Sequence, residues 1–212
     1  MSATKTCGNE PPKSKSELKR ERILLAASQL FCQLGFSATS MDNVAQQAGV
    51  SKQTVYSHFG NKDELFKMAV TSRCEAFQMS AMSNITLDDA KTTLNRFSKA
   101  FMQLLLSDEG MAIHRICIFE SQTNPHISQL FFSAGPEPII AELTRLLSYY
   151  HNQGVLVIDD CHCAAIQLLS MLRGEAMMRK EYNTPTQLSV DAIDNYLKHC
   201  VQLFLTGYQY KG

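Results

Sequence analysis

The stretch from Thr39 to Phe59, TSMDNVAQQAGVSKQTVYSHF, constrains the fold of this chain more than any other. Its first half carries apolar residues at helical spacing: Met41, Val44, Ala45 and Ala48. Gly49 follows directly, and a glycine just past a helix supplies the left-handed conformation that ends it. Ser51 is a good N-cap for a second helix, because its hydroxyl can accept a hydrogen bond from a free backbone N–H. The stretch therefore predicts two short helices joined by a tight turn.

The second of these helices has an apolar side formed by Val55 and Phe59 and an outer side rich in hydrogen-bond donors. The outer side consists of Lys52, Gln53, Thr54, Tyr56, Ser57 and His58. A helix, a glycine turn and a polar second helix are the plan of a helix-turn-helix, whose second helix fits the major groove of DNA. The alternative interpretation is an ordinary helical hairpin with a polar surface.

The segment before this stretch predicts a supporting helix over Ser16 to Leu34, with Ser16 as its N-cap. Its apolar stripe consists of Ile23, Leu24, Ala27, Leu30, Phe31 and Leu34. Gly35 is expected to end this helix. A hydroxyl at Thr39 or Ser40 would then cap the next helix, and it suits a phosphate at a helix N-terminus.

The segment after Phe59 predicts a fourth helix that runs to about Met82. Asn61 and Glu64 have the spacing of a capping box. Lys62 then lies in the first turn, where the helix dipole and the side chain would both attract a phosphate.

Charge is unevenly distributed, although the formal net charge is zero. Residues 1–70 hold nine Lys/Arg and six Asp/Glu, whereas residues 71–212 hold eleven and fourteen. The helix-turn-helix therefore lies in the basic third, which is the sign expected of a surface that faces phosphate. We expect residues 1–15 to form a flexible arm, whose lysines either reach DNA or stay solvated.

Residues 20 to about 70 resemble the DNA-binding domain of the TetR family of bacterial transcriptional regulators. The resemblance rests on Ile23, Ala26, Ala27, Phe31, Gly35, Phe36, Thr39, Ser40, Val44, Ala45, the AGVS of Ala48 to Ser51, Thr54 to Phe59, Lys62, Glu64 and Leu65. The motif and the resemblance together give these candidate DNA contacts: Thr39, Ser40, Ser51, Lys52, Gln53, Thr54, Tyr56, Ser57, His58 and Lys62. The family often has a small residue where this chain has Gln53, and a glutamine can make a bidentate contact to adenine.

The remaining two-thirds predict further helices, at about 85–106, 110–122, 126–135, 138–151, 160–182 and 189–208. The segment from about Met111 to Arg179 resembles the C-terminal domain of AefR-like members of the family. That resemblance rests on Glu120, Gly135-Pro136, Gly154, Asp159, Ala164-Ala165, Leu168 and Leu172-Arg173-Gly174. We therefore expect an all-α chain of about nine helices, with a helix-turn-helix domain at 16–62 and a ligand-binding and dimerisation domain at 63–212.

The last two predicted helices carry wide apolar faces. The family resemblance implies that this pair forms a four-helix interface in a homodimer. The candidate interface residues are Leu168, Leu172, Tyr196, Leu197, Val201 and Phe204. The alternative is a core within one chain. A twofold dimer would read a near-palindrome with half-sites ~34–36 Å apart.

The resemblance also implies a ligand pocket among the central helices. Ten methionines and eleven phenylalanines suit adaptable apolar walls, although such stripes usually form core. The candidate pocket residues are Phe97, Phe101, His114, Cys117, Phe131 and Met171. The expected inducer is an apolar or amphipathic small molecule.

Bulk composition adds limits on location and chemistry. No window resembles a signal peptide, and no apolar run approaches the ~20 residues that span a bilayer, so we expect a cytoplasmic protein without a membrane partner. The seven cysteines are scattered and are interpreted as free thiols. The pairs His114 with Cys117 and Cys161 with Cys163 leave a metal- or redox-switched regulator as an alternative. The leading interpretation has no metal or cofactor, and no nucleophile motif, phosphate loop or carboxylate pair indicates an enzyme.

Overall fold

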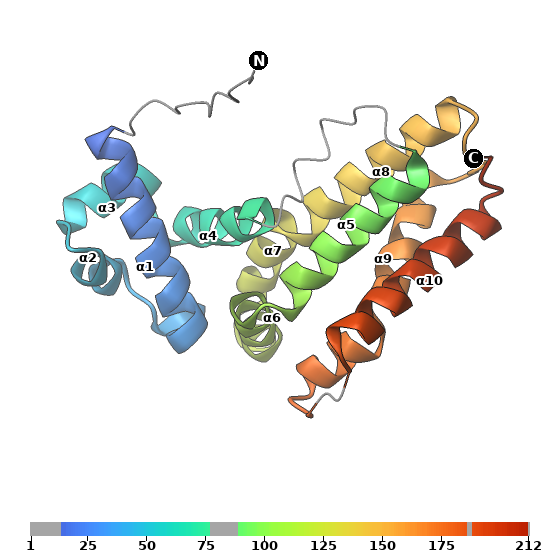
Figure 1. Ribbon diagram of the computed structural model, residues 1–212. Coiled ribbons are helices and arrows are strands. Elements are labelled where there is room, and N and C mark those ends of the chain that lie inside the picture. Colours follow the sequence, from blue (N-terminus) through green and yellow to red (C-terminus); the bar gives the residue numbers. More distant parts are fainter. Residues whose placement is uncertain (1–13, 77–88, 186–187, 212) are drawn as a thin grey trace, which may run out of the picture.

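The computed structural model describes residues 14–76, 89–185 and 188–211, and Figure 1 shows every regular element there to be a helix. The prediction of an all-α chain is therefore confirmed. The helices are α1 (Lys15–Ala38), α2 (Met41–Ala48), α3 (Lys52–Phe59), α4 (Lys62–Ala76), α5 (Ala90–Leu106), α6 (Asp108–Glu120), α7 (Pro125–Ala134), α8 (Pro136–Asn152), α9 (Cys161–Glu181) and α10 (Val190–Gly207). In the described ranges, none of these helices is long and apolar enough to cross a membrane. Most of the predicted arm, the predicted end of the fourth helix near Met82 and the predicted start of the fifth near Ile85 lie outside the described residues.

The first helix is capped by Ser14 and not by Ser16 as predicted. The Ser14 hydroxyl accepts from the backbone N–H of Glu17 at 3.2 Å, and the Glu17 carboxylate accepts from the backbone N–H of Ser14 at 2.6 Å. Ser14 is the N-cap because a glutamate lies three residues after it, and the two residues form a capping box.

The helix-turn-helix has the caps and the glycine turn that the sequence predicts. Ser40 caps α2 and Ser51 caps α3, each accepting from the backbone N–H three residues later. Gly49 ends α2 in the left-handed conformation, with φ of 64°. Asn61 Oδ1 likewise accepts from the Glu64 N–H at 2.9 Å, which is one of the two bonds of the capping box predicted for α4, whereas the Asn61 N–H donates to the Phe59 carbonyl at 2.8 Å.

A sharp break at Gly35 separates the body of α1 from its last turn. Gly35 has φ of 85° and ψ of 173°. Glycine adopts this conformation readily, whereas a residue with a side chain would be strained in it. The Glu120 carboxylate, at the end of α6, accepts from the backbone N–H of Phe36 at 3.0 Å and from the Ser37 hydroxyl at 2.5 Å. A Cβ atom on Gly35 would lie 2.5 Å from Glu120 Oε1. The break therefore lets the chain pass close to α6.

The buried side chains form two clusters that do not divide at residue 62. One cluster joins α1–α4 with residues of α6 and α7, including Ile113, Cys117 and Ile127. The other joins α5, α8, α9 and α10. In Figure 1, α6 and α7 lie between the α1–α3 group and the long helices α5, α8, α9 and α10. Helices α6 and α7 thus link the helix-turn-helix to the rest of the described chain.

The close approach at Gly35 gives a stability prediction. Gly35→Ala should lower the free energy of unfolding by about 3 kcal/mol, because it adds a strained φ and displaces the Glu120 carboxylate. Equilibrium urea unfolding measures this loss. Gly154→Ala is the matched control: its φ is 69°, but its Cβ would meet nothing within 4 Å. The control should lose about 1 kcal/mol, and equal losses in the two variants would contradict the close-approach argument.

Candidate nucleic-acid interface and central cavity

Helix α3 presents a polar face to solvent and an apolar face to the core. Val55 and Phe59 are buried in the cluster formed with α1, α2 and α4. The side chains left exposed are Lys52, Gln53, Tyr56 and Ser57, whereas Thr54 and His58 are half-buried. These exposed side chains lie on the outer face that the sequence predicts. Side chains on such a helix can contact the base edges when the helix enters the major groove.

The polar side chains of α3 differ in how firmly they are held. The hydroxyls of Ser51 and Thr54 lie 2.8 Å apart and are engaged in the cap of the helix. The Lys52 amine lies 2.8 Å from the Asp42 carboxylate on α2, and it lies over the ring of Tyr56. An ion pair between two exposed side chains contributes little, so the Lys52 amine can exchange this partner for another anion.

Two of the predicted DNA contacts point into the protein instead. Thr39 is buried, and its hydroxyl donates to the carbonyl of Gly35 at 2.7 Å. The Lys62 amine donates to the carbonyls of Phe36 and Thr39 at 2.9 and 3.0 Å and lies over the Phe36 ring. Burial lowers the pKa of Lys62, although the carboxylates of Glu120 and Asp63 favour its charged form. Both side chains hold the link between α1 and α2.

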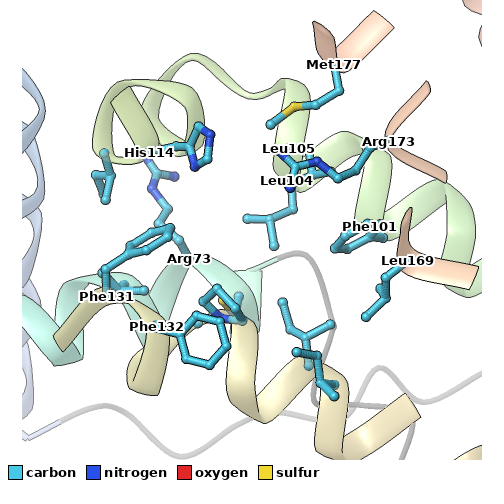
Figure 2. Close-up of a pocket in the computed structure, with 18 of the residues that line it drawn as sticks. Arg73, Phe101, Leu104, Leu105, His114, Phe131, Phe132, Leu169, Arg173 and Met177 are labelled. Carbon is cyan, nitrogen blue, oxygen red and sulfur yellow. The ribbon is translucent and has the colours of Figure 1, made fainter. Parts of the chain in front are cut away.

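A cavity with a volume of about 390 Å³ lies between α4, α5, α6, α7, α8 and α9. Its lining residues are Val70, Arg73, Cys74, Phe101, Leu104, Leu105, Gly110, Ile113, His114, Phe131, Phe132, Gly135, Pro136, Ile139, Ile140, Ile166, Leu169, Ser170, Arg173 and Met177. Figure 2 shows His114 and Arg173 on one side of this cavity and Phe132 on the opposite side. The volume and the mainly apolar wall are those of a small-molecule site.

Three of the six predicted pocket residues line this cavity: Phe101, His114 and Phe131. Phe97 is buried in the cluster that joins α5, α8, α9 and α10, which we call the α5–α10 cluster. Cys117 is buried in the cluster that joins α1–α4 with α6 and α7. The Met171 carbonyl accepts from the Tyr196 hydroxyl at 2.6 Å, and its side chain packs on the α5–α10 cluster. Arg73 and Arg173 were not predicted. The sequence did carry a signal for both. Arg73 lies three residues after Val70 and Arg173 lies four after Leu169, so each arginine falls at helical spacing from an apolar residue.

Most of the predicted interface residues are buried inside the chain. Leu168, Leu172, Leu197, Val201 and Phe204 belong to the α5–α10 cluster, because α9 packs on α5 and α8 while α10 packs on α5 and α9. Tyr196 is exposed but lies against Gly174, where α9 breaks. The pair leaves four apolar residues exposed: Met178, Tyr182, Val190 and Leu203. An interface on α9 and α10 stays a prediction, which now rests on exposed residues such as Leu203 in place of the buried ones.

Cys117, one of the cysteines behind the metal- and redox-switched alternative, is buried and poorly suited to that role, and so is Cys74. Burial raises the pKa of Cys74 to about 11 and that of Cys117 to about 12, so few thiolates form there at neutral pH. His114 faces Glu181 rather than a cysteine. In the part of the chain that the structure describes, no three His, Cys, Asp or Glu side chains gather in a way that could hold a metal ion.

Two family matches cover most of the chain. Residues 23–69 match the bacterial regulatory proteins of the tetR family, and residues 92–210 match the C-terminal domain of AefR-like transcriptional repressors. The first match agrees with the exposed polar face of α3, and the second agrees with the helical part that contains the cavity. The chain belongs to the TetR family of bacterial transcriptional regulators. Members of this family are regulators and not enzymes.

Relatives of known sequence include both activators and repressors. The chain is 42% identical over 126 residues to the transcriptional activator FasR of Mycolicibacterium smegmatis, a match that covers 57% of this chain and 54% of the relative. It is 41% identical over 136 residues to the regulator YhgD of Bacillus subtilis, covering 64% of this chain and 66% of that protein. The chain thus spans about half to two-thirds of these relatives. The repressor BepR of Brucella suis is 26% identical, covering 76% and 80%.

Solved structures share the whole fold. A tetR-family regulator of Mesorhizobium loti is 25% identical with a TM-score of 0.74, covering 92% of this chain and 99% of that one. The flavonoid-responsive regulator FrrA is 33% identical with a TM-score of 0.69, covering 89% and 96%.

The inward position of Lys62 gives a second stability prediction. Lys62→Met keeps the aliphatic stem but removes both hydrogen bonds from the charged amine, so the free energy of unfolding should fall by about 1.5–3 kcal/mol. Urea unfolding measures the change. Lys67→Met is the control on the same helix, because the Lys67 amine pairs only with a half-exposed neighbour, Glu64, at 2.6 Å. A loss no larger than that of the control would show that the Lys62 amine does not hold the α1–α2 link.

Proposed function

We propose that the protein is a ligand-responsive repressor that binds a palindromic DNA operator as a homodimer and is released from it by a small molecule. Residues 16–62 would form the DNA-binding domain, and residues 63–212 the ligand-binding and dimerisation domain. The observation that carries the proposal is the exposed polar face of α3, held by a buried apolar face and two caps. Such a helix can enter the major groove with its side chains toward the bases.

The cavity supports the ligand response, because two helices connect it with the DNA-binding part. Helix α6 contributes Ile113 and His114 to the cavity wall and ends at Glu120, which binds the link after Gly35. Helix α4 begins at Lys62, which binds the same link, and it contributes Arg73 to the wall. A ligand that favours one arrangement of α4 and α6 would shift the population of dimers that bind DNA.

The outer side of α9 and α10 supports the homodimer. Leu203 is 65% exposed on the side of α10 that faces away from the buried Leu197, Val201 and Phe204. A large apolar side chain left on the outward side of a helix favours contact with a second copy. A twofold pair would place two α3 helices on half-sites ~34–36 Å apart.

Base reading by α3 is tested by selecting binding sites from a random DNA library. Gln53→Ala should relax the preference at one base pair of each half-site, at a cost of about 1–3 kcal/mol for the preferred base, because a bidentate contact to adenine is lost. Fluorescence anisotropy with labelled operator measures the affinities. Gln103→Ala, an exposed glutamine on α5, is the control and should leave both motif and affinity unchanged. An identical selected motif for Gln53→Ala would reject this contact.

The dimer is tested by placing a charge on the outer side of α10. Leu203→Glu should shift sedimentation from dimer to monomer and weaken operator binding at least about tenfold, because two buried carboxylates would face each other across the twofold axis. Gln103→Glu, on an exposed position of α5 outside the DNA-binding part, controls for added surface charge. If Leu203→Glu still sediments as a dimer, the interface lies elsewhere.

Repression and release are tested together with a reporter gene placed behind the selected operator. The wild-type protein should lower expression, and a variant with its cavity filled by Ile140→Trp should still repress but no longer respond to inducer. Activation by the wild-type protein would contradict the repressor proposal.

A further inference from the structure

The wall of the cavity combines an apolar surface with two arginines and a histidine from three helices. Arg73 comes from α4, His114 from α6 and Arg173 from α9. No Asp or Glu is among the described residues that line the cavity. The remaining wall is apolar apart from Ser170 and backbone, including the rings of Phe101, Phe131 and Phe132. The wall therefore offers hydrogen-bond donors from basic side chains beside a mainly apolar surface.

The carboxylates that balance these cations stand outside the wall. Arg73 contacts Glu109, which is half-exposed, at 2.9 Å. The Glu181 atom Oε1 serves two partners, since it lies 2.5 Å from Arg173 Nη2 and 3.0 Å from His114 Nε2. A guanidinium carries five N–H donors, so Arg173 can hold a second carboxylate beside Glu181. The shared oxygen also places His114 and Arg173 close together at one end of the wall.

A charged ligand group enters such a cavity only where opposite charge meets it, because desolvation of an unpaired ion is costly. The arginine N–H groups that Glu109 and Glu181 leave over can donate to an anion, whereas a cation meets no carboxylate among the described lining residues. A neutral polar group gains less, because hydrogen bonds between ionised partners are roughly twice as strong as neutral ones. Phe101 and Leu169, next to Arg173 in Figure 2, leave an apolar path for the rest of the ligand.

We infer that the ligand of this cavity is an amphipathic organic acid, whose carboxylate binds Arg173 with His114 and Arg73 while its apolar body lies along the phenylalanine and isoleucine side chains. This inference rests on the proposed function, because it names the chemical class of the inducer. Arg173 lies in the interior of α9, directly before the break at Gly174, so the packing of that helix fixes its position.

Matched sets of probes test the sign of the charge. One set is decanoate, decanol and decylamine, and the other is 2-naphthoate, 2-naphthol and 2-naphthylmethylamine. Isothermal titration calorimetry on the full-length protein gives the affinities. In at least one set the acid should bind about 10- to 100-fold more tightly than its neutral partner, with the amine weakest. Acids that bind no better than their neutral partners in both sets, or that do not bind at all, overturn the inference.

Variants of the wall locate the carboxylate. Arg173→Met and Arg73→Met should each reduce the acid-to-alcohol affinity ratio, by about 10-fold or more for Arg173, whereas Arg173→Lys should restore part of it. The ratio is unaffected by a general loss of folded protein, because both probes use the same cavity. Arg145→Met is the control, since Arg145 lies on the outside of α8 and pairs with Glu142. An unchanged ratio in both wall variants would place the acid elsewhere.

Operator release separates this inference from the proposed function. If the alcohol or the amine binds more tightly and releases operator DNA, the ligand-responsive function stands and the organic-acid assignment is wrong. If the acid binds with the expected preference and the operator complex is unchanged, the assignment of the cavity stands and the proposed release by ligand fails.

Discussion

The link after Gly35 is the constraint on which the rest of this structure depends. A carboxylate and an ammonium hold it from opposite sides: Glu120 accepts from the N–H groups of Phe36 and Ser37, and Lys62 donates to the carbonyls of Phe36 and Thr39. The regular helical hydrogen bonds are interrupted at this bend, where the Thr39 N–H donates to the Phe36 carbonyl at 3.3 Å, and side chains from α6 and α4 supply further partners. The orientation of the helix-turn-helix is thereby tied to the first residue of α4 and the last residue of α6.

This arrangement explains why the buried clusters cross the expected domain boundary. Helix α6 packs Ile113 and Cys117 against the helix-turn-helix, although it belongs by sequence to the C-terminal part. The same helix presents His114 to the cavity. A close-packed helix that contacts two sites can transmit a displacement between them, because packed interiors deform little. The two parts of the chain therefore share a core rather than a flexible hinge at residue 62.

The sequence predicts most of what is decided within a few residues, and it misses what is decided by distant partners. The caps at Ser51 and Asn61 and the left-handed Gly49 follow from local chemistry, and the structure has them, whereas the capping box at Ser14 was missed. Lys62 reads as a phosphate ligand in the sequence, yet its amine binds the Phe36 carbonyl 26 positions away, which no local pattern reveals. The wide apolar faces of α9 and α10 were likewise visible, but only the packing on α5 and α8 shows which side is buried.

The cavity wall illustrates the same division between composition and placement. Arg73 and Arg173 are a hundred residues apart, and each reads in the sequence as an ordinary charge on a helix. In the fold they line one apolar cavity, where their charges are partly desolvated and are balanced by carboxylates behind the wall. Both ion pairs are partly exposed, and exposed ion pairs contribute little to stability. The stability of the fold therefore gives little reason for two arginines in this wall, which agrees with the binding of an anionic ligand.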